Sequence, residues 1–201
     1  MKSSFKSDLL KEKALQPLLD TYYQKLHFYN FKRIHTKTHQ LQGVDLYFIH
    51  KQTNKTYVID EKAQLDYIGE NLPTFAFEIC YLKKGISKQG WFYDASKITE
   101  FYALATNIQQ DGDKFFTSCK LTLVNRNKLQ QLLQKKGITL KSLKEYVKNH
   151  SKKYGQLNIP NLNPKKEGYL YASTSNKAEK PLNLILRLSW LIDCKVAKTI
   201  S

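Results

Sequence analysis

Two short apolar stretches, Gly43-Val-Asp-Leu-Tyr-Phe-Ile49 and Tyr57-Val-Ile-Asp-Glu-Lys-Ala63, decide the fold of this chain. They are rich in the β-branched and aromatic residues that favour strands. Between them lies Gln52–Thr56, a polar segment of the kind that forms a turn. The two stretches therefore predict a β-hairpin.

The hairpin brings charged residues together. Strand side chains alternate between faces, so Asp60 and Lys62 should share one face, while Ile59 and Glu61 point to the other. If the chain turns about Thr53 and Asn54, the other acid, Asp45, lies opposite Lys62 and diagonal to Asp60. Two carboxylates and an amine would then lie within a side chain's length of one another.

Such a cluster has two interpretations. Both acids are embedded in apolar runs, and two buried carboxylates repel each other unless a cation lies between them. Magnesium is commonly held by one or two carboxylates, and a neighbouring lysine can stabilise charge on a phosphoryl group. The alternative is a cross-strand Asp–Lys ion pair on a half-exposed sheet.

The composition favours a polyanionic partner. The chain has 33 Lys and Arg against 17 Asp and Glu, a net charge of +16 and a pI near 9.6. Such a field attracts nucleic-acid phosphates. The 13 Tyr, ten Phe and two Trp add stacking surfaces. We expect no membrane partner, because no amphipathic helix combines a basic face with an aromatic-rich apolar one.

Gly43-Val44-Asp45, followed fifteen residues after the first acid by Asp60-Glu61-Lys62, resembles the active-site hairpin of the PD-(D/E)XK nuclease superfamily. That superfamily often has proline where this chain has Val44. The resemblance implies a restriction-endonuclease-like core, an α/β (α+β) fold with a central mixed β-sheet flanked by helices. It also implies that Asp45, Asp60 and the backbone carbonyl of Glu61 bind Mg²⁺, or Mn²⁺ in its place, and that Lys62 is catalytic. Gln64 would continue the active face.

The function that follows is Mg²⁺-dependent hydrolysis of phosphodiester bonds, with DNA ahead of RNA as the substrate. Small nucleases of this kind often act as homodimers, which by analogy allows a homodimer here. The main alternative is a non-catalytic basic DNA- or RNA-binding protein on the same fold, in which the acids are structural. A basic ribosome- or RNA-associated protein is the third hypothesis.

The segment Ser7–Leu26 has the apolar periodicity of a helix. Its stripe, continued backwards, reaches Glu12, and an acid on a buried stripe needs a partner. Some members of the superfamily place a glutamate from the preceding helix beside the metal, so Glu12 is a candidate third ligand. Alternatively, Glu12 lies in the first turn and complements the helix dipole.

A second hairpin is predicted from Thr74–Leu82 and Trp91–Tyr93, extending the same sheet. Glu78 lies in its first strand, either as a further metal ligand or as the partner of a lysine. The turn contains three lysines that could contact a phosphate backbone or simply face solvent: Lys83, Lys84 and Lys88.

The remaining segments predict six further elements and a stripe of lysines. The first four, in order, are a helix over Ser96–Ala105, a strand over Phe115–Val124 and helices over Asn127–Lys136 and Thr139–Lys153. Thr139 is expected to cap the last helix. The last helix carries a basic stripe that could track phosphates or be solvated: Lys141, Lys144, Lys148 and Lys152. Two strands, or a strand and a short helix, are expected over Gly168–Ser173 and Pro181–Trp190.

We expect a single domain over residues 1–201, with a nuclease core over about residues 1–125 and a C-terminal elaboration of helices and strands over about 126–201. Three widely spaced cysteines fit a reducing cytoplasm, and no apolar run is long enough to span a bilayer.

Overall fold

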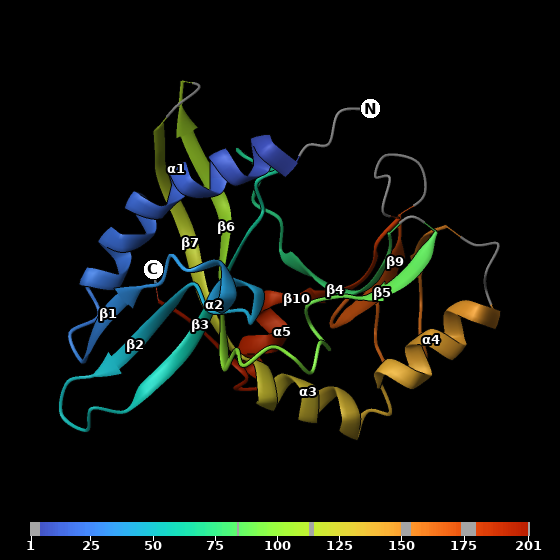
Figure 1. Cartoon of the computed structure of the whole chain (residues 1–201). Coiled ribbons are helices and arrows are strands. Elements are labelled where there is room, and N and C mark those ends of the chain that lie inside the picture. Colours follow the sequence, from blue (N-terminus) through green and yellow to red (C-terminus); the bar gives the residue numbers. More distant parts are fainter. Residues whose placement is uncertain (1–4, 84, 113–114, 150–153, 174–179, 201) are drawn as a thin grey trace. The chain divides into compact units, whose positions relative to one another are not determined.

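Two β-sheets, each with its own helices, make up the structure, a computed structural model (Figure 1). It describes residues 5–83, 85–112, 115–149, 154–173 and 180–200. The first unit comprises residues 1–72, 98–125 and 197–201, and the second comprises residues 73–97 and 126–196. With five helices among the described residues, the fold belongs to the expected mixed α and β class.

The first unit contains a six-stranded mixed sheet in the order β1-β2-β3-β6-β7-β11. Strands β3 and β6 are parallel, and every other neighbouring pair is antiparallel. Its strands are β1 (Tyr29–Arg33), β2 (Leu46–His50), β3 (Thr56–Ala63), β6 (Phe101–Asp111), β7 (Phe115–Asn125) and β11 (Ala197–Thr199).

Helix α1 (Phe5–Gln24) packs on one face of this sheet (Figure 1), and the short helix α2 (Lys37–Leu41) precedes β2. The predicted N-terminal helix is therefore confirmed. Leu15, Leu19 and Tyr23 recur every fourth residue, are almost completely buried, and pack with sheet residues that include Phe48 and Ile59.

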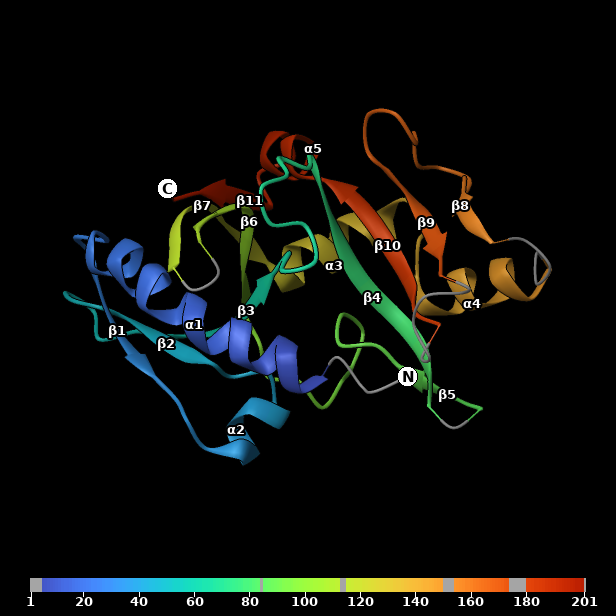
Figure 2. The same cartoon turned by 90° about the horizontal axis from the view of Figure 1, so that it is seen from above.

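The second unit contains an antiparallel sheet in the order β5-β4-β10-β9-β8. Its strands are β4 (Thr74–Lys83), β5 (Ile86–Gln89), β8 (Gly155–Leu157), β9 (Gly168–Ala172) and β10 (Leu182–Arg187). Helices α3 (Arg126–Lys135) and α4 (Leu140–Asn149) lie on one side of this sheet (Figure 2). Helix α5 (Leu188–Asp193) follows β10 directly.

The predicted helices at the start of the C-terminal segment are confirmed as α3 and α4, and the predicted cap of α4 is present. The predicted end of the second helix, residues 150–153, lies outside the described residues. The hydroxyl of Thr139 accepts a hydrogen bond from the backbone nitrogen of Ser142 at 3.2 Å. In return, the Ser142 hydroxyl accepts one from the backbone nitrogen of Thr139 at 2.9 Å. Two backbone donors at the helix start are thereby satisfied.

Two predicted elements differ from the structure. The helix expected over Ser96–Ala105 is wrong, because its first half is turn and loop and its second half belongs to strand β6. This strand lies between β3 and β7 and is buried from Tyr102 to Thr106, so it needs a continuous apolar run, and such a run also fits a helix. The strand expected over Trp91–Tyr93 is wrong as well, because those residues form a turn and the second strand of the hairpin is β5.

The second hairpin does not extend the first sheet. Strands β4 and β5 pair as an antiparallel hairpin, but β4 pairs on its other edge with β10. Residues 73–97 therefore join residues 126–196 in the second unit and do not belong with the expected core over residues 1–125. The C-terminal segment also ends outside the second unit, because β11 returns to pair with β7.

Among the described residues, no helix is both long enough and apolar enough to cross a membrane.

Candidate active site

The hairpin of β2 and β3 brings the two aspartates together. Leu46 pairs with Ile59, and Asp45, in the bend just before β2, lies close enough to Asp60 for their carboxyl groups to interact. The backbone nitrogen of Asp45 donates a hydrogen bond to the carbonyl of Ile59 at 2.9 Å. The expectation that Asp45 lies opposite Lys62 is therefore wrong, although all three side chains do share one face of the strands.

The turn explains this difference in register. His50 donates its backbone N–H to the carbonyl of Lys55 at 2.9 Å, which closes a four-residue loop over residues 51–54. Asn54 has a φ of 55°, a left-handed conformation that asparagine tolerates better than most residues. The turn is therefore centred one residue earlier than the polar segment suggested, which moves each cross-strand partner by two positions.

The chain reaches Asp45 through a tightly fixed corner after α2. Gly43 has a φ of 74°, the left-handed conformation that commonly ends a helix and that glycine adopts without strain. The next residue, Val44, is completely buried and donates its N–H to the carbonyl of His39 at 3.0 Å. Thr99 donates its hydroxyl to the Gly43 carbonyl at 2.8 Å. These contacts fix the backbone immediately before the first acid.

The three predicted groups come together around the backbone of Glu61. The ammonium of Lys62 forms an ion pair with Asp60, which is only 3% exposed, and donates to the carbonyl of Glu61 at 3.2 Å. On the other side of the residue, the backbone nitrogen of Glu61 donates to Asp45 Oδ2 at 2.7 Å. Two carboxylates, one ammonium and one carbonyl oxygen thus converge at the start of the hairpin.

Burial and mutual repulsion perturb these charges. Burial raises the pKa of Asp45 to about 7, and the nearby charge of Asp60 adds to this effect, whereas Lys62 opposes it. For Lys62, burial alone would lower the pKa, but the charges of Asp60 and Asp45 outweigh it and raise the pKa. Lys62 is therefore an ammonium at neutral pH, and Asp45 is a carboxyl group that a nearby cation would help to ionise.

Glu12 lies near this cluster, but not in the way expected. It is exposed, so the prediction that it continues the buried stripe of α1 is wrong. It is the eighth residue of a helix that begins at Phe5, so it lies beyond the first turn, where the helix dipole acts. Its negative charge nevertheless contributes to the raised pKa of Lys62. Its role as a third metal ligand stays a prediction.

The side chain of Glu61 has a set of partners that the sequence did not reveal. Tyr23 donates its hydroxyl to Glu61 Oε1 at 2.7 Å, and Arg33 donates to both oxygens, at 2.7 and 3.1 Å. Arg33 also donates from Nε to Asp20 at 2.7 Å. The strand alternation had placed Glu61 on the face opposite the two aspartates, which is the face that α1 covers. A carboxylate on a face covered by a helix needs hydrogen-bonding or charged partners, and from this need the sequence could have predicted a cation or hydroxyl near Glu61.

These contacts of Glu61 link helix α1 to the candidate site, because the side chain and the backbone of Glu61 have partners on opposite faces of β3. Its side chain is anchored to α1 and β1 on one face. Its N–H and carbonyl contact Asp45 and Lys62 on the other. The bidentate contact with Arg33 restrains the residue whose backbone N–H and carbonyl contact the cluster.

Gln64 follows directly after β3 and is half-buried. Its backbone nitrogen donates to the carbonyl of Ala105 at 3.1 Å, which extends the parallel contact between β3 and β6 by one residue. Alternation from Lys62 places its side chain on the same face as the cluster. A catalytic role for Gln64 stays a prediction.

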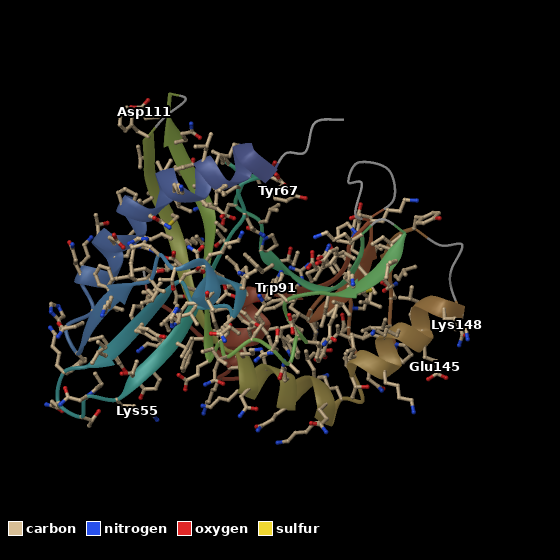
Figure 3. The ribbon with its side chains drawn as sticks, viewed as in Figure 1. Lys55, Tyr67, Trp91, Asp111, Glu145 and Lys148 are labelled. Atoms are coloured by element: carbon tan, nitrogen blue, oxygen red, sulfur yellow. The ribbon has the colours of Figure 1, made fainter. Side chains whose placement is uncertain are left out.

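The other predicted site residues belong to the second unit. Glu78 lies in β4, across from Asn183 of β10, so it is in a different sheet from Asp45 and Asp60. The predicted nucleic-acid contacts among the described residues are all exposed: Lys83 in β4, Lys88 in β5, and Lys141, Lys144 and Lys148 in α4. Lys148 and its neighbour Glu145 are labelled on α4 in Figure 3. Lys84 and Lys152 lie outside the described residues.

The donors at the hairpin suit a hard divalent cation. Carboxylate and carbonyl oxygens are the ligands that Mg²⁺ prefers, and it often takes only one or two carboxylates from the protein. Asp45, Asp60 and the Glu61 carbonyl supply three such oxygens. Over the part of the chain that the structure describes, no cluster of three or more His, Cys, Asp or Glu residues that could hold a metal occurs, so the candidate centre depends on this smaller set.

Comparison of the chain with models of protein families, with curated proteins and with solved structures found no match.

Proposed function

We propose that this protein is a metal-dependent nuclease that hydrolyses phosphodiester bonds in DNA. The observation that carries the proposal is the close approach of Asp45, just before β2, to Asp60 of β3, with the ammonium of Lys62 beside them. Burial first, and the charge of Asp60 second, raise the pKa of Asp45, so the folded protein is destabilised when both carboxylates are charged. A divalent cation between them would remove this repulsion.

Each residue then has a defined role. Asp45, Asp60 and the carbonyl of Glu61 bind the cation, and the side-chain contacts of Glu61 with Arg33 and Tyr23 keep that carbonyl in place. A bound Mg²⁺ ion would polarise the scissile phosphate and lower the pKa of a water molecule. Lys62, held as an ammonium by the two acids, positions the attacking group and offsets the negative charge that develops on the phosphate.

Two independent features support a nucleic-acid substrate. The net charge of +16 attracts polyanions, although the candidate site itself is rich in acids. The motif of Asp45, Asp60 and Lys62 on adjacent strands also resembles the PD-(D/E)XK superfamily, and an α helix precedes its mixed sheet here. Together they favour a restriction-endonuclease-like core with DNA as substrate.

The test is cleavage of plasmid and linear DNA by the purified full chain with Mg²⁺ or Mn²⁺, against an EDTA control. Cleavage should require the metal and should be lost in Asp60→Asn and Lys62→Met, while DNA binding in EDTA persists. Asp111→Asn, which removes an exposed acid at the tip of β6, is the matched control and should cleave normally. Full activity in both site variants would refute the assignment of this site.

One observation favours the alternative of a non-catalytic nucleic-acid-binding protein. The ion pair between Lys62 and Asp60 already neutralises the more buried of the two acids without a metal. If this pair is purely structural, Mg²⁺ will neither promote cleavage nor change the melting temperature of the protein. A metal-dependent rise in melting temperature that is lost in Asp60→Asn would exclude this alternative.

A further inference from the structure

The positive charge of the chain is divided unequally between the two units. Residues 73–97 and 126–196 contain 19 Lys and Arg against six Asp and Glu, a net charge of +13. The first unit contains 14 against 11, a net charge of only +3. The unit that carries the acidic cluster is therefore nearly neutral, and attraction for a polyanion resides mainly in the second unit.

The sheet of the second unit has two different faces. One face is apolar and carries Phe75, Phe77, Leu170, Leu184 and Leu186, all buried. This face is on the side of α3, because Phe77 packs against Phe92, whose carbonyl accepts a hydrogen bond from Gln130 of α3. None of the helices that the structure describes in this unit covers the other face. Strand alternation places on that face every second residue of β9 and β10.

The face that turns away from α3 and α4 is aromatic and basic. Tyr169 and Tyr171 are two positions apart on β9, and Tyr171 is 43% exposed. Their Cα atoms are separated by about 7 Å, as strand geometry requires. Asn183 and Ile185 of β10 lie directly across from them.

A β-bulge brings further residues to the same face. Leu182 pairs with Cys80 and Asn183 with Glu78, so Ile79 is an extra residue in β4. Cys80 thereby turns toward α4, and the charge of Lys144 acts on its thiol. Tyr81 consequently returns to the opposite face.

Lysines complete this surface at the hairpin. Tyr81 lies across from Lys88 of β5, and Lys83, two positions further along β4, shares the face with it. Lys83 and Lys88 are both exposed. Glu78, which pairs with Asn183, adds one acid to the same face. We name Tyr81, Tyr169, Tyr171, Lys83 and Lys88 the tyrosine face.

We propose that the tyrosine face binds single-stranded nucleic acid. Aromatic rings on a sheet face can stack against bases, and lysines at its edge can contact the backbone phosphates. Tyr171 is exposed, and Tyr81 and Tyr169 are half-buried. The spacing of Tyr169 and Tyr171 lets two successive bases of an extended strand stack on them. In a duplex the faces of the bases are already stacked on one another, so these rings would have nothing to bind. Under the proposed nuclease function, on which this part rests, the substrate is a nucleic acid that has a single-stranded segment.

The first test measures binding of a labelled oligothymidylate of about 16 nucleotides, the upper site size of such modules. Fluorescence anisotropy is recorded in EDTA with the full chain carrying Asp60→Asn, so that cleavage cannot interfere. Tyr171→Leu should weaken binding about 5- to 100-fold, whereas Tyr171→Phe, which keeps the ring, should bind within about twofold of the parent. Phe115→Ala removes a ring that is 73% exposed in the first unit and should have no effect.

The second test compares two pairs of lysines within the same unit. Lys83→Ala/Lys88→Ala removes two charges from the tyrosine face, and Lys141→Ala/Lys148→Ala removes two from α4, on the other side of the sheet. The first pair should reduce the slope of log affinity against log salt by about 1.4, because each phosphate contact with a single strand contributes about 0.7. The α4 pair should change the slope much less.

Three further ligands test whether the tyrosine face prefers single strands or binds any polyanion through its positive charge. Oligouridylate should bind comparably to oligothymidylate, because stacking is tolerant of the sugar. A blunt duplex and vesicles of anionic phospholipid should bind more weakly. Equal losses in Tyr171→Leu and Tyr171→Phe, a larger effect from the α4 lysines, or tighter binding of duplex or vesicles would overturn the proposal.

These outcomes are distinct from failure of the proposed function. Binding of the single strand without metal-dependent cleavage would refute the nuclease and leave the tyrosine face in place. Metal-dependent cleavage of duplex DNA by a protein that does not bind oligothymidylate would refute the role of the tyrosine face and leave the nuclease in place.

Discussion

The replacement Asp45→Asn tests the central electrostatic feature without assuming any activity. In the folded protein the pKa of Asp45 is about 7, compared with its ordinary value of 3.8. A carboxyl group with a raised pKa holds its proton more tightly when folded. Its contribution to stability is therefore most favourable below pH 4 and is lost as the pH rises from about 4 to 7. At higher pH the folded protein must bear the charge beside Asp60.

The magnitude follows from the same values. The gap between 3.8 and about 7 corresponds to about 4 kcal/mol at about 1.4 kcal/mol per pKa unit, and partial exposure of Asp45 reduces this to about 2–4 kcal/mol. Asparagine has the same shape, and its oxygen can still accept the N–H of Glu61. In EDTA at pH 8, Asp45→Asn should therefore unfold at a higher urea concentration than the wild type, and the advantage should disappear at pH 4.

Magnesium should make the wild type more stable than Asp45→Asn. A saturating cation stabilises the wild type by about 2.7 kcal/mol when its concentration is 100 times the dissociation constant. Asp45→Asn lacks one carboxylate ligand and should gain much less. Asp111→Asn, at an exposed position, should follow the wild type throughout. The reasoning is refuted if Asp45→Asn is less stable than the wild type in EDTA at pH 8, or if the difference between them does not depend on pH.

Three further changes test the supports of the site and of the second unit, each by urea unfolding of the full chain. Arg33→Met removes the guanidinium from Glu61 and Asp20 and should cost about 3–5 kcal/mol, because both carboxylates lose their counter-charge. A loss below about 1 kcal/mol would mean that solvent already screens this network. Gly43→Ala introduces a side chain at a φ of 74° and should cost about 1–2 kcal/mol, and an unchanged midpoint would contradict the strain. Thr139→Ala removes the cap of α4 and should cost about 1 kcal/mol, whereas Thr139→Ser should preserve stability, and equal loss in both would contradict the capping role.

Local pattern predicted the hairpin but could not fix its register. Alternation of apolar and charged residues placed Asp45, Asp60 and Lys62 on one face because strand geometry determines faces directly. The register depends on the turn, and polar residues over 51–56 allow several turns. The turn that contains the left-handed residue Asn54 pairs Leu46 with Ile59, and so brings Asp45 close to Asp60.

The second sheet depended on contacts distant in the sequence. Strand β4 pairs with β10, which lies about a hundred residues later, and nothing in the local sequence of either strand names its partner. The same reason explains why β6 was mistaken for a helix. Its apolar run is dictated by burial between β3 and β7, and that environment is not visible in the run itself.

The C-terminal strand β11 gives the order of synthesis a structural consequence. Strand β7 is complete at Asn125, but its outer neighbour β11 begins only at Ala197, after the remainder of the second unit has been made. During translation the nascent first sheet must present β7 as an unpaired edge, and such edges promote association between chains. A chain that terminates after residue 125 would retain the acidic hairpin and yet expose that edge permanently. Residues 197–199 thus cover the edge of β7 only after the remainder of the second unit has been made.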